Sequence, residues 1–421
     1  MNRRTTLLAA PALFAIPAAR AATPAQEALI QGFSPARLGR IRVAMAREIE
    51  RQTFAGAITH IQRRGEVVHS EIHGHLDPAR TRPMRPDALF LLASMTKPIT
   101  SVMTMILVEE GVIALRDPIG THLPELRNLQ LEVRRAGADP ELVAPASQPT
   151  VQDLLRHTSG HVYAASAPAG SRIGRMQGEL DIEQRNGNVT TDEFLRRLAT
   201  IPLAHQPGST FHYSICTDIL GVLCERATRT RFDRLVKTRI LDPLGMNDSA
   251  WFVRPQDLAR VAMGMPNDPA VAQMWASYRI EQDPGDVAAF RGGAGMVSTT
   301  ADYAKFCQMI LDGGRGNGVR LLSPATVRFM LSDHTLGMAG TTFASTGPGY
   351  GFGLGFAVRR GEGMGFAPGT IGDAMWAGAW GVSFTVDPQN QLFGLMMANA
   401  PTPRVHTRML FKNLMYGALV G

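Results

Sequence analysis

The sequence predicts a mixed α/β (α+β) fold in which one antiparallel sheet is built from both ends of the chain and flanked by helices. A helical subdomain is expected between the two parts. Strand patterns gather near both ends, whereas residues from about 120 to 290 carry helical patterns and loops. Strands and helices do not alternate, which argues against a doubly wound parallel sheet. The 421 residues are 45% hydrophobic and 19% charged, as in a globular protein with a large core.

The first 21 residues have the pattern of an export signal. Arg3 and Arg4 precede an apolar stretch over residues 7–19, and Ala19-Arg20-Ala21 matches a small-x-small cleavage site. The paired arginines indicate twin-arginine export, so we expect a mature chain that begins at Ala22 and resides in the periplasm. A frayed N-terminal helix is the alternative. The apolar stretch is too short and too interrupted by proline to span a bilayer, so we expect no stable membrane insertion.

The N-terminal part of the predicted sheet follows a helix. Residues 35–52 have the apolar spacing of an amphipathic helix. Residues 56–62 and 66–73 are rich in β-forming residues, and Arg63-Arg64-Gly65 between them predicts a hairpin. A loop rich in Pro and Arg then leads to a helix over about residues 94–110, which Gly111 ends at the C′ position.

The C-terminal part supplies the remaining strands, predicted over residues 350–359, 374–378, 382–386 and 392–399. Helices are predicted over residues 303–311 and 404–416, and polar loops over residues 136–148 and 164–188. We therefore expect residues 22–421 to form a single domain. Its α/β part covers about residues 22–120 and 290–421, and its helical subdomain covers about residues 121–289.

The charged residues and cysteines exclude some classes of function. Four of the 43 basic residues are lysines and the rest are arginines. The net charge of +7 is spread along the chain rather than gathered in runs, so we expect no nucleic-acid binding. Cys216, Cys224 and Cys307 form an odd and sparse set. We interpret them as small core residues rather than as a disulfide framework.

A Ser-x-x-Lys pattern stands at the start of the helix predicted from residue 94. Ser94 and Lys97 are three positions apart, so the hydroxyl and the amine share one helix face. A serine hydroxyl needs a base, and lysine can serve if its pKa falls from about 10.4 toward 7. Arginine cannot do this, because it does not deprotonate, so a lysine here is informative in an arginine-rich chain. The pattern predicts Ser94 as a nucleophile and Lys97 as its base.

The segment Ser94-Met95-Thr96-Lys97-Pro98-Ile99-Thr100 resembles the nucleophile segment of serine β-lactamase-related esterases. Further segments resemble the same family in the family's order, at residues 154–160 (Leu-Leu-Arg-His-Thr-Ser-Gly), 206–214, 242–246 and 293–299. Together they span about residues 35–415. The resemblance is to the class C β-lactamase and family VIII carboxylesterase group. It implies a β-lactamase/transpeptidase-like fold and an acyl-enzyme mechanism.

The resemblance also implies roles for single residues. Ser94 matches the acylated nucleophile, Lys97 its partner, and Tyr213 the tyrosine that shuttles a proton between nucleophile and leaving group. Class C β-lactamases have Tyr-x-Asn at this place, whereas this chain has Tyr213-Ser214-Ile215, so the amide is missing. His157 lies in a loop that is a structural turn in the resembled family, so we assign it no proton-transfer role.

A third motif separates the activities within the resembled family. β-Lactamases and penicillin-binding proteins place Lys-Thr-Gly or a close variant on the strand that lines the site, where the cation helps to hold the substrate carboxylate. The matching stretch here, Trp376-Ala377-Gly378, resembles the Trp-x-Gly of family VIII esterases. An apolar indole in place of the cation favours neutral esters, although Trp376 as a plain core residue is an alternative. The family pattern places the oxyanion donors at the N–H groups of Ser94 and Ala379.

One histidine group offers a different chemistry. His69, His73, His75 and Asp77 form His-x3-His-x-His-x-Asp, whose end is similar to the zinc motif of metallo-β-lactamases. That motif continues with His, whereas Pro78 stands here. The four side chains occupy alternate positions of a predicted strand and share one face. We interpret them as the polar face of that strand and predict no metal site.

The sequence therefore predicts a serine hydrolase that cleaves carboxylic esters through an acyl-enzyme on Ser94, without a metal or cofactor. Its expected partner is a small-molecule ester or amide. The same chemistry on a β-lactam ring or a D-amino-acid peptide is one alternative. A sensor that becomes acylated without turnover is an alternative of another class.

Overall fold

The structure is a computed structural model that describes residues 28–421, apart from residues 136, 138, 184–188, 278–287 and 341–345. The predicted export signal at residues 1–21 lies outside the described residues. None of the helices in the described part of the chain combines the length and the apolar character that crossing a bilayer requires.

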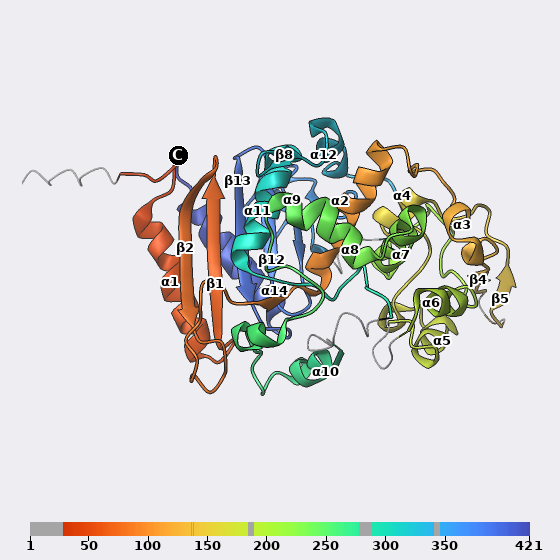
Figure 1. Ribbon diagram of the computed structural model, residues 1–421, viewed down its shortest axis with the longest axis horizontal. Coiled ribbons are helices and arrows are strands. Elements are labelled where there is room, and N and C mark those ends of the chain that lie inside the picture. Colours follow the sequence, from red (N-terminus) through yellow and green to blue (C-terminus); the bar gives the residue numbers. More distant parts are fainter. Residues whose placement is uncertain (1–27, 136, 138, 184–188, 278–287, 341–345) are drawn as a thin grey trace, which may run out of the picture.

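A seven-stranded antiparallel sheet forms the centre of the molecule, in the order β2-β1-β13-β12-β11-β10-β9 (Figure 1). The two ends of the chain meet where β1 pairs with β13, which confirms the predicted sheet assembled from both ends. The β1–β2 hairpin turns at Arg64 and Gly65, whose φ values of 52° and 81° are both positive, as a two-residue turn of type I′ requires. The strands are β1 (Gly56–Arg63), β2 (Glu66–Gly74), β9 (Tyr350–Phe352), β10 (Ala357–Arg359), β11 (Ala374–Ala377), β12 (Ser383–Asp387) and β13 (Leu392–Ala398).

Helices cover both faces of the sheet. Every residue of β13 is buried, and its side chains alternate between two cores. Phe393, Leu395 and Met397 belong to the core that contains α2 (Thr96–Glu109) and α11 (Thr300–Leu311). The opposite side chains of β13 belong to a second core with α1 (Pro35–Glu50) and α14 (Arg404–Ala418), which pack against each other.

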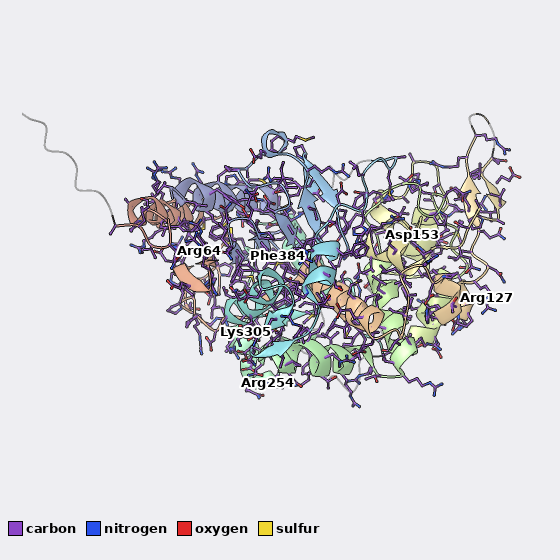
Figure 2. All side chains as sticks on the ribbon, turned by 90° about the horizontal axis from the view of Figure 1, so that it is seen from above. Arg64, Arg127, Asp153, Arg254, Lys305 and Phe384 are labelled. Atoms are coloured by element: carbon purple, nitrogen blue, oxygen red, sulfur yellow. The ribbon has the colours of Figure 1, made fainter. Side chains whose placement is uncertain are left out.

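A helical region extends from one end of the sheet, so that Arg64 in the hairpin and Arg127 in this region lie at opposite ends of the molecule (Figure 2). The position of the subdomain boundary stays a prediction. The α-helices between residues 119 and 277 are α3 (Ile119–His122), α4 (Val151–Leu155), α5 (Ile173–Glu179), α6 (Thr191–Leu198), α7 (Cys216–Thr228), α8 (Phe232–Val236), α9 (Asp242–Leu244) and α10 (Pro269–Ser277), with α12 (Pro324–Met330) later in the chain. The shorter elements are β3 (Phe90–Leu91), β4 (Leu131–Val133), β5 (Glu141–Val143), β6 (Val297–Ser298), β7 (Arg315–Gly316), β8 (Val319–Arg320), the 3-10 helices η1 (Ala93–Met95), η2 (Pro124–Leu126), η3 (Ala164–Ser166), η5 (Pro255–Arg260) and η6 (Glu362–Met364), and the π-helix η4 (Lys237–Leu241).

Three local predictions were wrong. The strand expected over residues 350–359 is a hairpin of β9 and β10, because the chain turns between Phe352 and Ala357. The loop expected over residues 136–148 contains β5, which pairs with β4. The loop expected over residues 164–188 contains η3 and α5, where Ile173 is buried in the core. The Pro and Gly content of the last two segments favours loops, but contacts with the rest of the fold hold parts of them in regular structure. The three cysteines are buried and free, as predicted.

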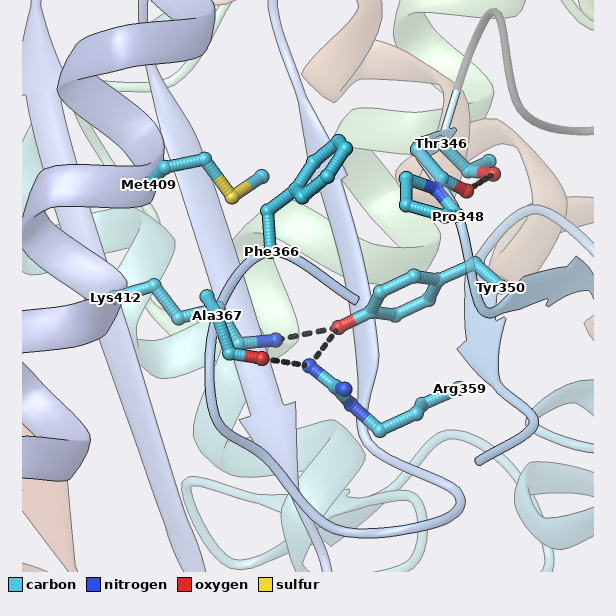
Figure 3. A pocket seen from close by; sticks show the side chains of 9 residues that line it. Thr346, Pro348, Tyr350, Arg359, Phe366, Ala367, Met409 and Lys412 are labelled. Atoms are coloured by element: carbon cyan, nitrogen blue, oxygen red, sulfur yellow. Dashed lines mark hydrogen bonds between the residues drawn. The ribbon is translucent and has the colours of Figure 1, made fainter. Parts of the chain in front are cut away.

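A buried charge network ties α14 to the sheet edge (Figure 3). Asp373 is fully buried and accepts hydrogen bonds from Arg359 Nε at 2.7 Å and from Lys412 Nζ at 3.1 Å. The Tyr350 hydroxyl donates to Asp373 at 2.8 Å and accepts from Lys412 at 2.6 Å. Burial lowers the pKa of Lys412 to about 8, although Asp373 acts in the opposite direction. Lys412 is thus a second buried lysine, but its partners are structural.

Candidate active site

Ser94 lies in the 3-10 turn η1, two residues before α2 begins. The sequence predicted that the long helix begins at Ser94. This start was wrong, because α2 begins at Thr96. Ala93 has a φ of 44°, in the left-handed region that costs a residue other than glycine about 1–3 kcal/mol. Ser94 is half-buried, whereas both neighbours are buried. The strained turn therefore presents the Ser94 hydroxyl outward from an otherwise buried segment.

Hydrogen bonds hold the turn on both sides of Ser94. The Leu92 N–H donates to the Met296 carbonyl at 2.8 Å, and the Tyr303 hydroxyl donates to the Met95 carbonyl at 2.8 Å. Tyr303 is fully buried, so the second bond is shielded from water. The segment predicted at residues 293–299 thus supports the nucleophile turn.

Lys97 lies in the first turn of α2 and is 2% exposed. Its Nζ donates to Ser94 Oγ at 3.4 Å and to the carbonyl oxygen of Gly293 at 2.6 Å. The Gly293 N–H donates to Asp218 Oδ1 at 3.1 Å, and a methyl group at Gly293 would overlap the Asp218 carboxylate. Gly293 therefore has to be glycine for Asp218 to reach its N–H while Lys97 binds its carbonyl oxygen.

The charge state of Lys97 differs from the prediction. Burial lowers its pKa, but Tyr163, Tyr213 and Asp218 together outweigh burial and hold the pKa above its usual value. The expected fall toward neutrality is therefore wrong, because the Asp218 carboxylate and the hydroxyl oxygens of the two tyrosines favour the ammonium. The raised pKa favours the ammonium form of Lys97 at neutral pH.

Tyr213 precedes α7 and packs beside Lys97, with its ring centroid 5.0 Å from Nζ. The hydroxyl of Tyr213 is buried and has no hydrogen-bond partner among the described residues. The ring is fixed by Trp376 at 5.2 Å and by His157 at 4.7 Å between centroids. Ser94, Lys97 and Tyr213 thus meet in space, although they are far apart in the sequence.

Tyr163 and Asp218 are parts of this site that sequence reasoning missed. The Tyr163 ring lies 5.8 Å from Lys97 Nζ and 5.7 Å from the Tyr213 ring, so the ammonium has an aromatic face on two sides. Burial raises the pKa of Tyr163, which keeps it a neutral phenol. The one sequence signal for Tyr163 was its place three residues after Gly160. Asp218 offered no sequence signal beyond its place in the first turn of α7.

The third motif lies against the nucleophile turn. Strand β11 carries Trp376 and contacts η1, and a methyl group at Gly378 would overlap the Leu92 carbonyl. Ala379 follows and is half-buried, and its N–H has no acceptor among the described residues. Trp376 is only 4% exposed and packs between Tyr213 and Phe352, so it forms a wall behind Tyr213 rather than a free surface.

His157 supports Tyr213. Its Nδ1 accepts a hydrogen bond from the Ser214 N–H at 3.3 Å, and its ring packs against the Tyr213 ring. Burial and the nearby Lys97 hold the pKa of His157 well below its usual value, so the imidazole is neutral. These contacts position the tyrosine loop.

The predicted four-residue polar face does not stay together. His69 and His73 both contact Thr59, whereas Asp77 accepts hydrogen bonds from Thr81 and Arg82 in the following loop. His75 lies in the short bridge to Pro83 beyond the end of β2. Glu71, which the motif did not include, lies with His69 and His73 instead.

Comparisons with known proteins show the family of the chain. The family model described as Beta-lactamase matches residues 41–414. Protein Rv1367c of Mycobacterium tuberculosis is 33% identical over 356 residues, which cover 82% of this chain and 85% of that protein. Esterase EstB of Burkholderia gladioli is 31% identical over 379 residues, which cover 86% of this chain and 90% of that protein.

A solved structure shows the same fold. EstCE1, described as a hydrolase with promiscuous acyltransferase activity, superposes with a TM-score of 0.74 at 24% identity, covering 92% of this chain and 99% of its own. This agreement confirms the predicted β-lactamase/transpeptidase-like fold. The family match covers most of the chain and includes every residue of the Ser94 site. The chain therefore belongs to the Beta-lactamase family of serine β-lactamase-related proteins.

Proposed function

We propose that the protein is a serine hydrolase of carboxylic esters that works through an acyl-enzyme on Ser94. The observation that carries the proposal is the buried Lys97 amine, 3.4 Å from Ser94 Oγ and beside the unpartnered Tyr213 hydroxyl. Covalent acyl transfer needs a nucleophile, a cation and a proton carrier in contact with one another. The esterase name of EstB supports the same activity.

The charge of Lys97 assigns the proton to Tyr213. An ammonium cannot accept the Ser94 proton, so a phenolate at Tyr213 takes it while Lys97 stabilises the negative charge. Ser94 Oγ bonds to the ester carbonyl carbon, and the N–H groups of Ser94 and Ala379 hold the oxyanion. The carbon–oxygen bond of the ester then breaks, and the alcohol leaves with the proton from Tyr213.

Deacylation repeats these steps with water. Water attacks the acyl carbonyl of Ser94 and gives one proton to Tyr213. The acid leaves, and Ser94 Oγ recovers that proton. Lys97 keeps its own proton throughout, so it acts as a fixed cation.

Trp376 favours esters over β-lactams as substrates. It stands where the resembled β-lactamases carry a lysine, and it offers no cation to a substrate carboxylate. Its contacts with Tyr213 and Phe352 place an apolar indole, rather than a cation, behind Tyr213.

Steady-state turnover of a short-chain nitrophenyl ester and of a chromogenic cephalosporin tests the proposal. We expect ester turnover with little cephalosporin turnover, and loss of ester turnover in Ser94→Ala. Rapid cephalosporin turnover without esterase activity would favour the β-lactamase alternative. A single burst without a steady state would favour the sensor. Retained turnover in Ser94→Ala would exclude Ser94 as the nucleophile.

We also propose that the protein acts in the periplasm, because residues 1–21 have the pattern of a twin-arginine signal. Cell fractionation of the full chain and of an Arg3→Lys/Arg4→Lys variant tests this. The wild type should appear shortened in the periplasmic fraction and the variant in the cytoplasm. Equal distribution of the two would contradict twin-arginine export.

A further inference from the structure

A second cluster of polar side chains lies on β2, away from Ser94. His69, Glu71 and His73 alternate along the strand, so they project from the same face. One ligand atom from each of the three side chains lies within 4.8 Å of the others. They face the layer of α1, whereas Ser94 leads into α2 on the other face of the sheet. The cluster therefore has no part in the ester chemistry.

The two imidazoles converge on one hydroxyl. Nε2 of His69 lies 2.8 Å from Thr59 Oγ1, and Nε2 of His73 lies 2.9 Å from the same atom. A hydroxyl has one proton and two lone pairs, so Thr59 can donate to at most one Nε2. When it donates to one ring, that Nε2 directs its lone pair at Thr59 Oγ1 and the other Nε2 donates its proton to the same atom. Both histidines are 7% exposed, and burial lowers the pKa of His69 to about 4 and lowers that of His73, so both rings are neutral.

Glu71 supplies the negative charge of the cluster and is shared with a surface arginine. Arg42 on α1 donates to the two carboxylate oxygens of Glu71 at 2.5 and 3.2 Å. The Arg42 side chain is 71% exposed, so it can turn to water at little cost. The carboxylate can then bind a cation instead of the guanidinium.

We propose that His69, Glu71 and His73 bind one Zn²⁺ ion per chain. Two neutral imidazoles and one carboxylate are ligands that Zn²⁺ prefers, with a fourth position for water or the Thr59 hydroxyl. Binding replaces the hydrogen bonds to Thr59 by bonds from both Nε2 atoms to the metal, which requires the proton of each ring to be on Nδ1. Arg42 competes with the ion for Glu71.

Isothermal titration calorimetry tests this site on the untagged full chain, stripped with a chelator and titrated with zinc chloride at pH 7.5. We expect one ion per chain. His69→Gln/His73→Gln should weaken binding more than about tenfold, since loss of even an outer-shell partner costs about that much. His75→Gln is the matched control on the same hairpin and should leave the affinity unchanged. Ester turnover of each variant reports that it is folded.

The Arg42→Gln variant tests whether Glu71 is a zinc ligand or whether the two histidines bind the ion alone. Freeing Glu71 should tighten zinc binding several-fold, whereas a pair of histidines alone would not respond. X-ray absorption of the zinc-loaded chain should show two imidazoles and oxygen ligands. The proposal is overturned by absence of saturable binding, by equal affinity of the double histidine variant, or by an Arg42→Gln affinity no tighter than that of the wild type.

Discussion

Lys97 Nζ lies closer to the carbonyl oxygen of Gly293, at 2.6 Å, than to the hydroxyl oxygen of Ser94, at 3.4 Å. A carbonyl oxygen accepts a hydrogen bond and cannot donate one, so this contact uses an N–H of the lysine. Together with the raised pKa of Lys97, it indicates an ammonium anchored beside the nucleophile. In the proposed mechanism the proton of Ser94 therefore moves to Tyr213.

Tyr213→Phe should lower kcat for ester hydrolysis by about 10²–10⁴-fold, the usual contribution of a general acid–base group. Its hydroxyl has no hydrogen-bond partner in the part of the chain that the structure describes, so its removal should leave the free energy of unfolding within about 0.5 kcal/mol of the wild type. Steady-state kinetics and urea denaturation measure the two quantities.

Tyr163→Phe is the matched control for Tyr213→Phe, because Tyr163 borders the same ammonium and stays neutral. Its effect on kcat should be smaller. An equal loss in the two variants would contradict the assignment of the proton to Tyr213.

Asp218→Asn should shift the basic limb of the pH–rate profile to lower pH. The Asp218 carboxylate raises the pKa of Lys97, so its loss lowers that pKa and the ammonium is lost at lower pH. Profiles of kcat/KM for the wild type and the variant measure the shift. A basic limb that stays in place or moves upward would show that Lys97 is not needed as a cation.

Acid should destabilise the fold partly through His161. Burial lowers the pKa of His161 to about 4, whereas an unfolded chain binds the proton near pH 6.5. The unfolded state binds this proton more readily than the folded state does. The free energy of unfolding is therefore unaffected by His161 above pH 6.5 and falls as the pH drops toward 4. Between pH 7 and pH 4.5 this amounts to on the order of 2 kcal/mol.

Urea unfolding at pH 7 and pH 4.5 checks the role of His161. The loss of stability between the two pH values should be about 2 kcal/mol smaller in His161→Gln than in the wild type. His122→Gln, which removes a histidine paired with Asp117 near the surface, provides the comparison. An equal loss in His161→Gln and the wild type would contradict the prediction.

Asp373→Asn should destabilise the protein by about 3–5 kcal/mol, because it leaves the buried cations Arg359 and Lys412 without a counter-charge. Asp242→Asn removes the exposed pair with Lys237 and should cost less than about 1 kcal/mol. Adding Lys412→Met to Asp373→Asn should restore part of the loss. Chemical denaturation measures all three, and a cost as small as that of Asp242→Asn would contradict the network.

The β1–β2 hairpin and the meeting of Ser94 with Lys97 could be predicted because they depend on local patterns. Alternation marks the hairpin at Arg64, and the three-residue spacing places Lys97 over Ser94. The charge of Lys97 could not be predicted, because it depends on Tyr163 and Asp218, which only the folded chain brings to the amine. Loop composition likewise did not reveal α5, whose order comes from packing.

Mass spectrometry of the enzyme quenched during turnover of a short-chain nitrophenyl ester tests the central claim most directly. The account predicts one acyl group per chain on the peptide that contains Ser94, a faster build-up than decay of this species, and no acylation in Ser94→Ala. Acylation of another residue, or turnover of the ester without any acyl-enzyme at Ser94, would contradict it.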